Sequence, residues 1–298
     1  MARGRVGREG LYEALDRFRE ALTARDPARV EWSPALRYTE NNVALEPGDG
    51  VWNTVTALGP YDLRFADSQA DSGHGQVALF TSVEETDAVS PCAIRLAVRE
   101  GAIEEAEIVV ARNKDEGFPF LGQTFEDKPA MRAEVPEAER ISRDEMIALA
   151  NGYFETIERN NGMIRTRFHP HCNRVENGVQ TTNNPGFPLP VARLGCEAQF
   201  ALGWYRYDDA LRGRRFPLVD IERGIVLAYG FIDHSGKLGD YELTDGTKVS
   251  SLVRRPHSYY LAEAFKIRDG AIEQVEAVFH TVPYRMPSPW DRGGAKVA

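Results

Sequence analysis

One sequence pattern occurs twice in this chain, and it constrains the fold more than any other feature. Arg99-Glu-Gly-Ala-Ile-Glu-Glu-Ala-Glu recurs as Arg268-Asp-Gly-Ala-Ile-Glu-Gln-Val-Glu, with the Arg, Gly, Ala, Ile and two Glu positions identical. Each copy reads as a strand, a tight turn on Gly101 or Gly270, and a second strand. Because a hairpin cannot bury its own apolar face, we expect each copy to complete a larger sheet. The chain is therefore predicted to be a tandem duplication.

The rest of the first half agrees with this interpretation. Between residues 10 and 26, apolar side chains recur every three to four positions, which predicts an amphipathic helix. Residues 36–43 are an unusually polar strand candidate, and Tyr38, Glu40 and Asn42 share one of its faces. That face is either a solvated edge or the wall of a cavity, and in the second case Tyr38 and Glu40 bind substrate.

The second half repeats these elements in the same order. Ser142 and Glu145 form a capping-box pattern at the start of its predicted helix. Between the two copies, residues 114–140 lose their periodicity and gain prolines, which is typical of a linker. We therefore predict an α+β protein of two tandem cone-shaped barrels, each with N-terminal helices packed on a curved, mostly antiparallel sheet. The predicted bounds are 10–113 for the first cone and 141–285 for the second.

The polar strand and the hairpin recur at different offsets. Glu176-Asn177 aligns with Glu40-Asn41 at 136 residues, whereas the two hairpins are 169 residues apart. The difference implies that extra residues follow the polar strand of the second copy, and we place them between residues 181 and 243.

The composition limits the cellular setting and the binding partners that we expect for this protein. The chain has 36 Lys and Arg against 45 Asp and Glu, a net charge of −9 that argues against binding to nucleic acid or to an anionic membrane. No segment resembles a signal peptide or reaches membrane-spanning length. Cys92, Cys172 and Cys196 form no dense framework, so a reducing, cytoplasmic setting is expected. The motifs of P-loop, Rossmann, serine-hydrolase and HExxH zinc enzymes do not occur.

Histidines are concentrated in the second copy. Five of the six follow residue 168, and only His74 lies in the first copy. Histidine is well suited to proton transfer near neutral pH, so the second cone is predicted to be catalytic. The alternative is that these histidines fill surface and core positions. His280 ends the second hairpin, where the first copy has Ala111, and it is taken as a catalytic candidate.

Two strands of the second copy carry polar faces suited to acid–base chemistry. Arg174 and Glu176 share one face, either as an ion pair that orients a substrate or as a structural salt bridge. On the later strand, His257, Tyr259 and Glu263 alternate onto one face. Such a set suits an elimination, in which an acid protonates the leaving hydroxyl while a base accepts a proton. We assign His257, Tyr259, Arg174 and Glu176 to catalysis, and Glu263 to substrate binding.

Four further side chains are assigned to substrate binding. Asn177 lies on the opposite face of the polar strand, and Tyr260 on the opposite face of the later strand. His169 and His171 have the spacing of a metal pair, but the intervening proline and the lack of a third nearby ligand argue against a metal. His169 is therefore placed with the substrate. Tyr205 belongs either to the core or to the lining of an apolar pocket.

The order of helix, polar strand, short helix and curled antiparallel strands, with its two Arg-x-Gly-Ala-Ile-Glu hairpins, resembles the nuclear-transport-factor-2-like fold. This fold is also called polyketide-cyclase-like or ketosteroid-isomerase-like. The resemblance covers residues 10–113 and 141–284. It implies a deep pocket between a concave sheet and its covering helices, where acid–base residues act without metal or nucleotide. A tandem member of this size is also similar to the cofactor-independent diarylpropane lyases of bacterial lignin catabolism, which remove water and formaldehyde to leave a stilbene.

The resemblance sets the functional expectations. The first is a cofactor-independent lyase or dehydratase of a small aromatic substrate, such as a lignin-derived diarylpropane diol. The alternatives are a polyketide cyclase or ketosteroid-type isomerase, and a non-catalytic module that binds a small hydrophobic ligand. Because the hairpin strands of such cones commonly pair between subunits, a homo-oligomer is expected.

Overall fold

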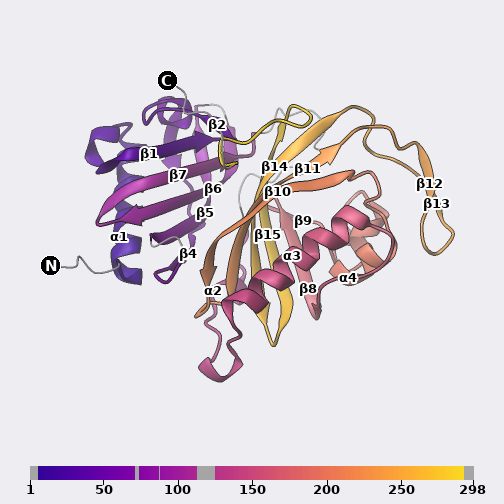
Figure 1. Cartoon of the computed structure of the whole chain (residues 1–298). Coiled ribbons are helices and arrows are strands. Elements are labelled where there is room, and N and C mark those ends of the chain that lie inside the picture. The colour runs from indigo at the N-terminus through magenta and orange to yellow at the C-terminus, as the bar shows by residue number, and fades with distance from the viewer. Residues whose placement is uncertain (1–5, 71–73, 87, 113–124, 292–298) are drawn as a thin grey trace.

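The computed structural model describes residues 6–70, 74–86, 88–112 and 125–291, and two blocks of helix and sheet follow each other along the chain (Figure 1). The first block comprises α1 (Arg8–Thr23), β1 (Trp32–Glu40), β2 (Val43–Ala44), β3 (Val55–Leu58), β4 (Leu63–Asp67), β5 (Gly75–Glu85), β6 (Ala88–Arg99) and β7 (Ala102–Val110). A short helix, α2 (Pro129–Arg132), lies between the blocks. The second block comprises α3 (Arg143–Arg159), β8 (Phe168–Glu176), β9 (Val179–Gln180), α4 (Cys196–Ala201), β10 (Ala210–Asp220), β11 (Ile225–His234), β12 (Asp240–Glu242), β13 (Lys248–Ser250), β14 (His257–Arg268) and β15 (Ala271–Val282).

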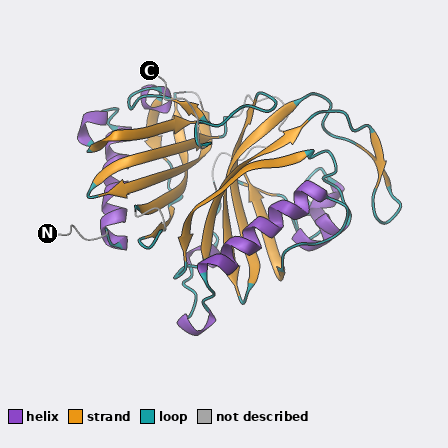
Figure 2. Cartoon of the chain, viewed as in Figure 1, coloured by secondary structure: helices purple, strands orange, loops and turns teal. Residues whose placement is uncertain are grey.

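The two main sheets have matching topologies. The first runs β2-β1-β7-β6-β5-β3, with β4 also paired to β5, and the second runs β10-β11-β14-β15-β8-β9. In each, the hairpin motif forms two antiparallel strands whose second strand pairs in parallel with the polar strand, β1 or β8. The protein is therefore α+β, with two sheet-dominated halves (Figure 2).

The first helix of each half packs on its sheet. The predicted apolar stripe of α1 is buried at Leu11, Leu15 and Phe18, as expected for one face of a helix. At α3, Ser142 Oγ accepts from the Glu145 amide at 3.3 Å, and a Glu145 carboxylate oxygen accepts from the Ser142 amide at 3.0 Å. Both predicted helices and the capping box are confirmed.

A side-chain clamp occurs at the same place in both halves. The amide groups of Asn41 and Asn177 each exchange two hydrogen bonds with the backbone of one residue on the neighbouring strand, Val110 and Phe279. Both asparagines have positive φ, 47° and 46°, a conformation that Asn tolerates better than most residues. The side chain of Asn177 is thus committed to ending β8, and the prediction that it binds substrate is wrong.

The extra residues of the second half lie in two places. One is segment 181–209, between β9 and β10, which contains α4. The other is segment 235–256, which joins β11 to β14 and contains β12 and β13, whereas β5 ends at Glu85 and β6 begins at Ala88. The insertion therefore extends beyond the predicted limit of residue 243. We refer to these two segments together as the cover.

The halves pack through the faces of their sheets that point away from α1 and α3. Phe65 and Phe80 of the first half share one apolar core with Leu227, Tyr229 and Phe231 of the second. The C-terminal segment then returns to the first half, where the Trp290 indole donates to Thr39 Oγ1 at 3.2 Å. The surfaces that we expected to pair between subunits are, in part, paired within one chain.

A buried ionic cluster crosses this interface. Glu107 of β7 is fully buried and contacts Arg95 of its own half at 3.0 Å and Arg215 of the other half at 2.6 Å. The Tyr260 hydroxyl also donates to Glu107. Tyr260 therefore points into the interface between the halves, and its predicted role in substrate binding is wrong.

The interior of the first half is filled by aromatic rings. Phe18 packs edge-on against Trp32 and Trp52, and the Trp52 indole donates to the Tyr38 hydroxyl at 2.9 Å. Glu40 accepts a hydrogen bond from the Val51 amide at 2.6 Å. Tyr38 and Glu40 are thus core and loop-anchoring residues, and their predicted role in substrate binding is wrong.

The predicted linker is in part outside the described residues. The described residues do not include 114–124, the part of the linker that contains Phe118, Phe120 and Leu121. Within 125–140, Phe125 stacks on Tyr61 of the first half, with ring centroids 5.1 Å apart. No helix of the described residues is both long enough and apolar enough to cross a lipid bilayer.

Candidate functional site

A cavity of about 770 Å³ lies in the second half, between the concave face of its sheet and the cover. Its floor comes from β8, β11, β14 and β15, and its lid comes from both inserted segments, including Phe187, Trp204 and Leu252. Mostly apolar clefts of this size are typical of small-molecule sites. The first half lacks both inserted segments, and its equivalent space holds Trp52 and Tyr38.

The period-two alternation of β14 supplies one line of floor residues. His257, Tyr259, Leu261 and Glu263 all line the cavity, while Tyr260 faces the first half. At a rise of about 3.3 Å per residue, the Cα atoms of Tyr259 and Glu263 lie roughly 13 Å apart along the strand. The prediction that His257, Tyr259 and Glu263 share one face of the strand is confirmed.

Strand register sorts the floor into zones. At one end His234 of β11 lies opposite His257. In the middle Leu261 lies beside Phe279 of β15, and both line the cavity. At the other end Glu263 lies beside Ala277, which in turn lies beside Glu176 of β8. The cavity is thus polar at both ends and apolar between them.

The histidine end contains an Asp–His pair. Asp208 Oδ1 accepts from His234 Nε2 at 2.9 Å, and both side chains are buried. Burial raises the pKa of Asp208, while the bond to His234 favours its charged form. An aspartate at Nε2 fixes the proton there and leaves Nδ1 as the basic nitrogen. This Nδ1 has no hydrogen-bond partner among the described residues.

A second imidazole lies directly on the first. The ring centroids of His234 and His257 are 4.6 Å apart and their planes differ by 19°. His257 Nδ1 contacts the Arg255 carbonyl oxygen at 3.0 Å, so it carries the proton, and Nε2 has no partner within the described chain. Burial and the neighbouring His234 lower the pKa of His257. In its neutral form, each ring therefore has one nitrogen that can accept a proton, Nδ1 in His234 and Nε2 in His257.

Tyr259 completes this end of the cavity. Its ring packs edge-on against His234 and His257, with centroids 4.7 and 5.0 Å away. Burial, aided by the charges of Asp208 and Glu176, raises the pKa of Tyr259. The phenol therefore keeps its proton at neutral pH.

The opposite end holds two carboxyl groups. Glu263 is buried and hydrogen-bonded to Tyr153. Burial, together with the negative charge of Glu176, raises the pKa of Glu263 to about 8. At neutral pH this carboxyl group is mostly protonated, so it can both donate and accept a hydrogen bond.

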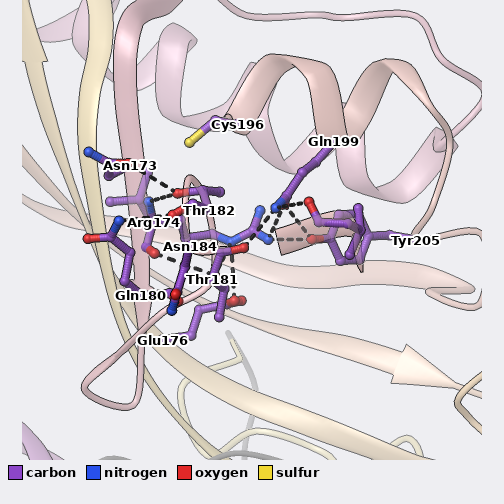
Figure 3. Close-up of polar contacts among 12 residues, drawn as sticks. Asn173, Arg174, Glu176, Gln180, Thr181, Thr182, Asn184, Cys196, Gln199 and Tyr205 are labelled. Carbon is purple, nitrogen blue, oxygen red and sulfur yellow. Dashed lines mark hydrogen bonds and ion pairs between the residues drawn. The ribbon is translucent and has the colours of Figure 1, made fainter. Parts of the chain in front are cut away.

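Arg174 connects this end to the cover (Figure 3). Its guanidinium donates to Gln199 Oε1 at 2.8 Å, to Thr181 Oγ1 at 3.2 Å and to the Tyr205 hydroxyl, and it pairs with Glu176 at 3.2 Å. Because these protein groups engage it, Arg174 holds segment 181–205 against the floor rather than offering a free cation to a ligand.

No set of three or more His, Cys, Asp or Glu side chains within the described ranges is arranged to hold a metal ion. Residues 139–279, which include the floor and the cover, match the model of a family described as a domain of unknown function, DUF8021. No curated protein sequence matches the chain.

Two solved structures show weak similarity. A de novo designed protein with a curved β-sheet is 18% identical, over 35% of this chain and 87% of that one, with a TM-score of 0.28. A protein of unknown function with a cystatin-like fold from Methylobium petroleophilum PM1 is 15% identical, over 47% of this chain and all of that one, also with a TM-score of 0.28. Likenesses this low carry no argument about function.

The structure brings together half of the residues that the sequence singled out. The cavity lining includes these six: Arg174, Glu176, Tyr205, His257, Tyr259 and Glu263. His280 is not among them, because it shares the face of Val278 and Val282, which pack towards the first half. His169 lies near the start of β8, where its Nδ1 accepts from the His171 amide at 3.3 Å, away from the cavity. The predicted placement of His280 and His169 at the site is wrong.

Several polar residues of the cavity were not predicted as site residues from the sequence. They include Asp208, His234, Arg254, Arg255 and Thr281, and the Thr281 hydroxyl is buried without a partner in the described structure. His234 ends β11 opposite His257, so a correct strand pairing would have revealed it. Asp208 lies in the insertion, for which the first half offers no template.

Proposed function

We propose that this protein is a lyase or dehydratase that acts on a small aromatic substrate through its own acid and base side chains. The observation that carries the proposal is the buried Asp208–His234 pair at the wall of a cavity rich in aromatic side chains. The basic Nδ1 of His234 has no partner among the residues that the structure describes. An aspartate that fixes the tautomer of a histidine is a recurrent device for making a general base.

The roles follow from the positions of the groups. His234 accepts the proton of a substrate phenol, and Tyr259 protonates the hydroxyl that leaves as water, so that a quinone methide forms. His257, the second base, then takes the proton of a neighbouring hydroxymethyl group. Cleavage of the carbon–carbon bond releases formaldehyde, and its electrons restore the aromatic ring and form the alkene. The proton held by His234 returns to Tyr259 before His257 accepts its own, and the proton held by His257 then passes to the phenolate.

At the glutamate end of the cavity, the charge distribution favours an uncharged group of the substrate. At the far end Glu263 and Glu176 face the cavity, and the nearby cation, Arg174, is paired with protein groups. A carboxylate placed at that end would meet these two carboxyl groups, whereas Arg254 and Arg255, which also line the cavity, precede His257 in the chain. A phenol or alcohol would find a protonated carboxyl group with which to exchange a hydrogen bond. A lignin-derived diarylpropane diol, with hydroxyl groups on an apolar skeleton, meets these requirements.

The finer description of the fold belongs to this proposal. We infer that each half is a nuclear-transport-factor-2-like cone and that the whole chain is related to the diarylpropane lyases. The repeated helix, polar strand and hairpin support this inference. Assembly into a homo-oligomer is part of the same proposal, and light scattering on the purified full chain measures it directly.

The deciding experiment is an incubation of the full chain with a panel of diarylpropane diols. Formaldehyde is measured chemically and stilbene by its absorbance, and a His234→Ala variant serves as the inactive control. Formation of both products by the native protein alone supports the proposal. If the same compounds raise the melting temperature but no product forms, the cavity belongs to a binding module and the lyase proposal fails. Rearranged or cyclised products without formaldehyde indicate an isomerase or cyclase.

A further inference from the structure

Two cysteines meet where the cover contacts the floor of the cavity. Cys172 lies on β8, and Cys196 is the first residue of α4. Their sulfur atoms are 2.8 Å apart, and the side chains are 2% and 1% exposed. Figure 3 shows the Cys196 thiol pointing from α4 towards the strand that carries Arg174.

This separation is close to that of a bond. Non-bonded carbon atoms pack at about 3.5–4.0 Å, and the two sulfurs of a disulfide lie roughly 2.0 Å apart. A movement of less than about 1 Å would join them, within the fluctuations of a packed protein. Cys92, the third cysteine, is buried in the first half and provides an internal control.

We propose that Cys172 and Cys196 form a reversible disulfide that fastens the cover onto the cavity floor. A peroxide is a suitable oxidant because it is small enough to reach a buried pair. One thiolate attacks a peroxide oxygen, which gives a sulfenic acid and releases hydroxide. The second thiol then displaces the sulfenic oxygen as water, so that two thiols and one hydrogen peroxide yield one disulfide and two waters. A dithiol reductant reverses the reaction.

The bond lies within the network that shapes the cavity. Arg174 follows Cys172 by two residues, and Gln199 follows Cys196 by three; these two side chains are joined by the 2.8 Å hydrogen bond. Phe200, next in α4, lines the cavity. In the reduced protein this contact rests on hydrogen bonds and packing. In the oxidised protein it is covalent, so opening of segment 181–205 is restricted and a bound molecule leaves more slowly.

The reaction is expected to be slow. Contact with Cys196 and burial raise the pKa of the Cys172 thiol, which leaves little of the reactive thiolate. Oxidation therefore requires minutes to hours or transient opening of α4, and the reduced protein should tolerate brief exposure to air.

The test counts thiols in the full chain. Reduced protein is treated with hydrogen peroxide for several hours, unfolded in guanidinium and alkylated, and its mass is measured. We expect one alkylated cysteine, Cys92, and a proteolytic fragment that links the peptides of Cys172 and Cys196. Cys92→Ala should still form the link, whereas Cys172→Ala and Cys196→Ala should not. Three alkylated thiols, or sulfinic acid on either residue, would overturn the proposal.

Two further readouts test the fastening of the cover. A disulfide that closes a loop of this length should raise the melting temperature by roughly 5 °C. Dissociation of a neutral fluorescent probe, N-phenyl-1-naphthylamine, should be slower in the oxidised protein and return to the original rate after reduction. If the disulfide forms but the probe dissociates at the same rate, the bond does not restrict opening of the cover. None of these measurements needs turnover, so the inference is judged separately from the proposed lyase activity.

Discussion

His234 and His257 stack ring on ring, with centroids 4.6 Å apart, and each keeps one nitrogen free of hydrogen-bond partners among the described residues. Two imidazolium ions at this distance would repel each other strongly in a buried site. A positive charge on His234 therefore opposes protonation of His257. This is the behaviour that two successive proton abstractions require, because the first proton must leave before the second base is fully used.

Removal of the Asp–His pair should abolish turnover with little effect on folding. We expect His234→Ala to lower kcat by about 10²–10⁴-fold, and Asp208→Asn to cause a similar loss because the wrong tautomer is stabilised. His280→Ala is the matched control, since His280 lies on the opposite face of the sheet. Steady-state kinetics and circular dichroism of the three variants check this. Equal losses in all three would show that the cavity is not where the chemistry occurs.

Acid should weaken both activity and stability through His257. Its pKa in the folded protein lies below the usual value of 6.5, so the unfolded chain binds the proton more readily than the folded protein does. The stabilisation from the neutral ring is complete above pH 6.5 and is lost as the pH falls through the folded pKa. Urea unfolding of the native protein and of His257→Gln, measured from pH 7.5 to 5, should give curves that converge at the acidic end. Parallel curves would contradict the lowered pKa.

Glu263 should produce the opposite dependence on pH. Its pKa of about 8 in the folded protein exceeds the usual value of 4.5, so the folded protein binds the extra proton. This stabilisation is present below pH 4.5 and is lost as the pH rises towards 8. Glu263→Gln should therefore gain roughly 1–3 kcal/mol relative to the native protein between pH 5 and pH 8.5. Burial raises the pKa of Glu276, which faces the first half, to about 7, so Glu276→Gln should shift stability in the same direction over a lower pH range. Urea unfolding of both variants across this pH range measures the two effects.

Glu107 should be the most sensitive position in the interface between the halves. Burial opposes its charge, but Arg215 and Arg95 outweigh that effect and hold the pKa of Glu107 below its usual value. Glu107→Gln leaves two arginines without their buried counter-charge and should cost about 3–5 kcal/mol. Glu105→Gln, which removes a more exposed partner of Arg95, should cost less than about 1 kcal/mol. Urea unfolding of both variants provides the comparison, and equal costs would contradict it.

Much of the architecture could be predicted from local sequence patterns. The helix stripe that includes Leu11 and the capping box at Ser142 required only neighbouring residues, and both were predicted. The alternation along β14 also placed Tyr259 and Glu263 on the cavity side, because side-chain direction in a strand has period two.

The positions of the other site residues could not be predicted from residue spacing in the sequence. His280 was selected because it differs from Ala111, yet the face of β15 on which it lies is decided by packing between the halves. Tyr38 occupies the position of Arg174 in the repeat, but the first half fills its interior with Trp52. Asp208 comes from an insertion, whose path follows from tertiary contacts and not from a local period.

The ionic cluster around Glu107 illustrates a consequence of having both halves in one chain. In a symmetric dimer, any substitution appears on both sides of the contact at once, so an acid introduced on one side faces the same acid on the other. Here Glu107 of one half meets Arg215 and Tyr260 of the other, and the reverse pairing need not exist. Because the partners are encoded separately, one half can give up its cavity for a dense aromatic interior while the other keeps its interior open. Division of labour is thus available to a single gene product without a second, differently mutated subunit.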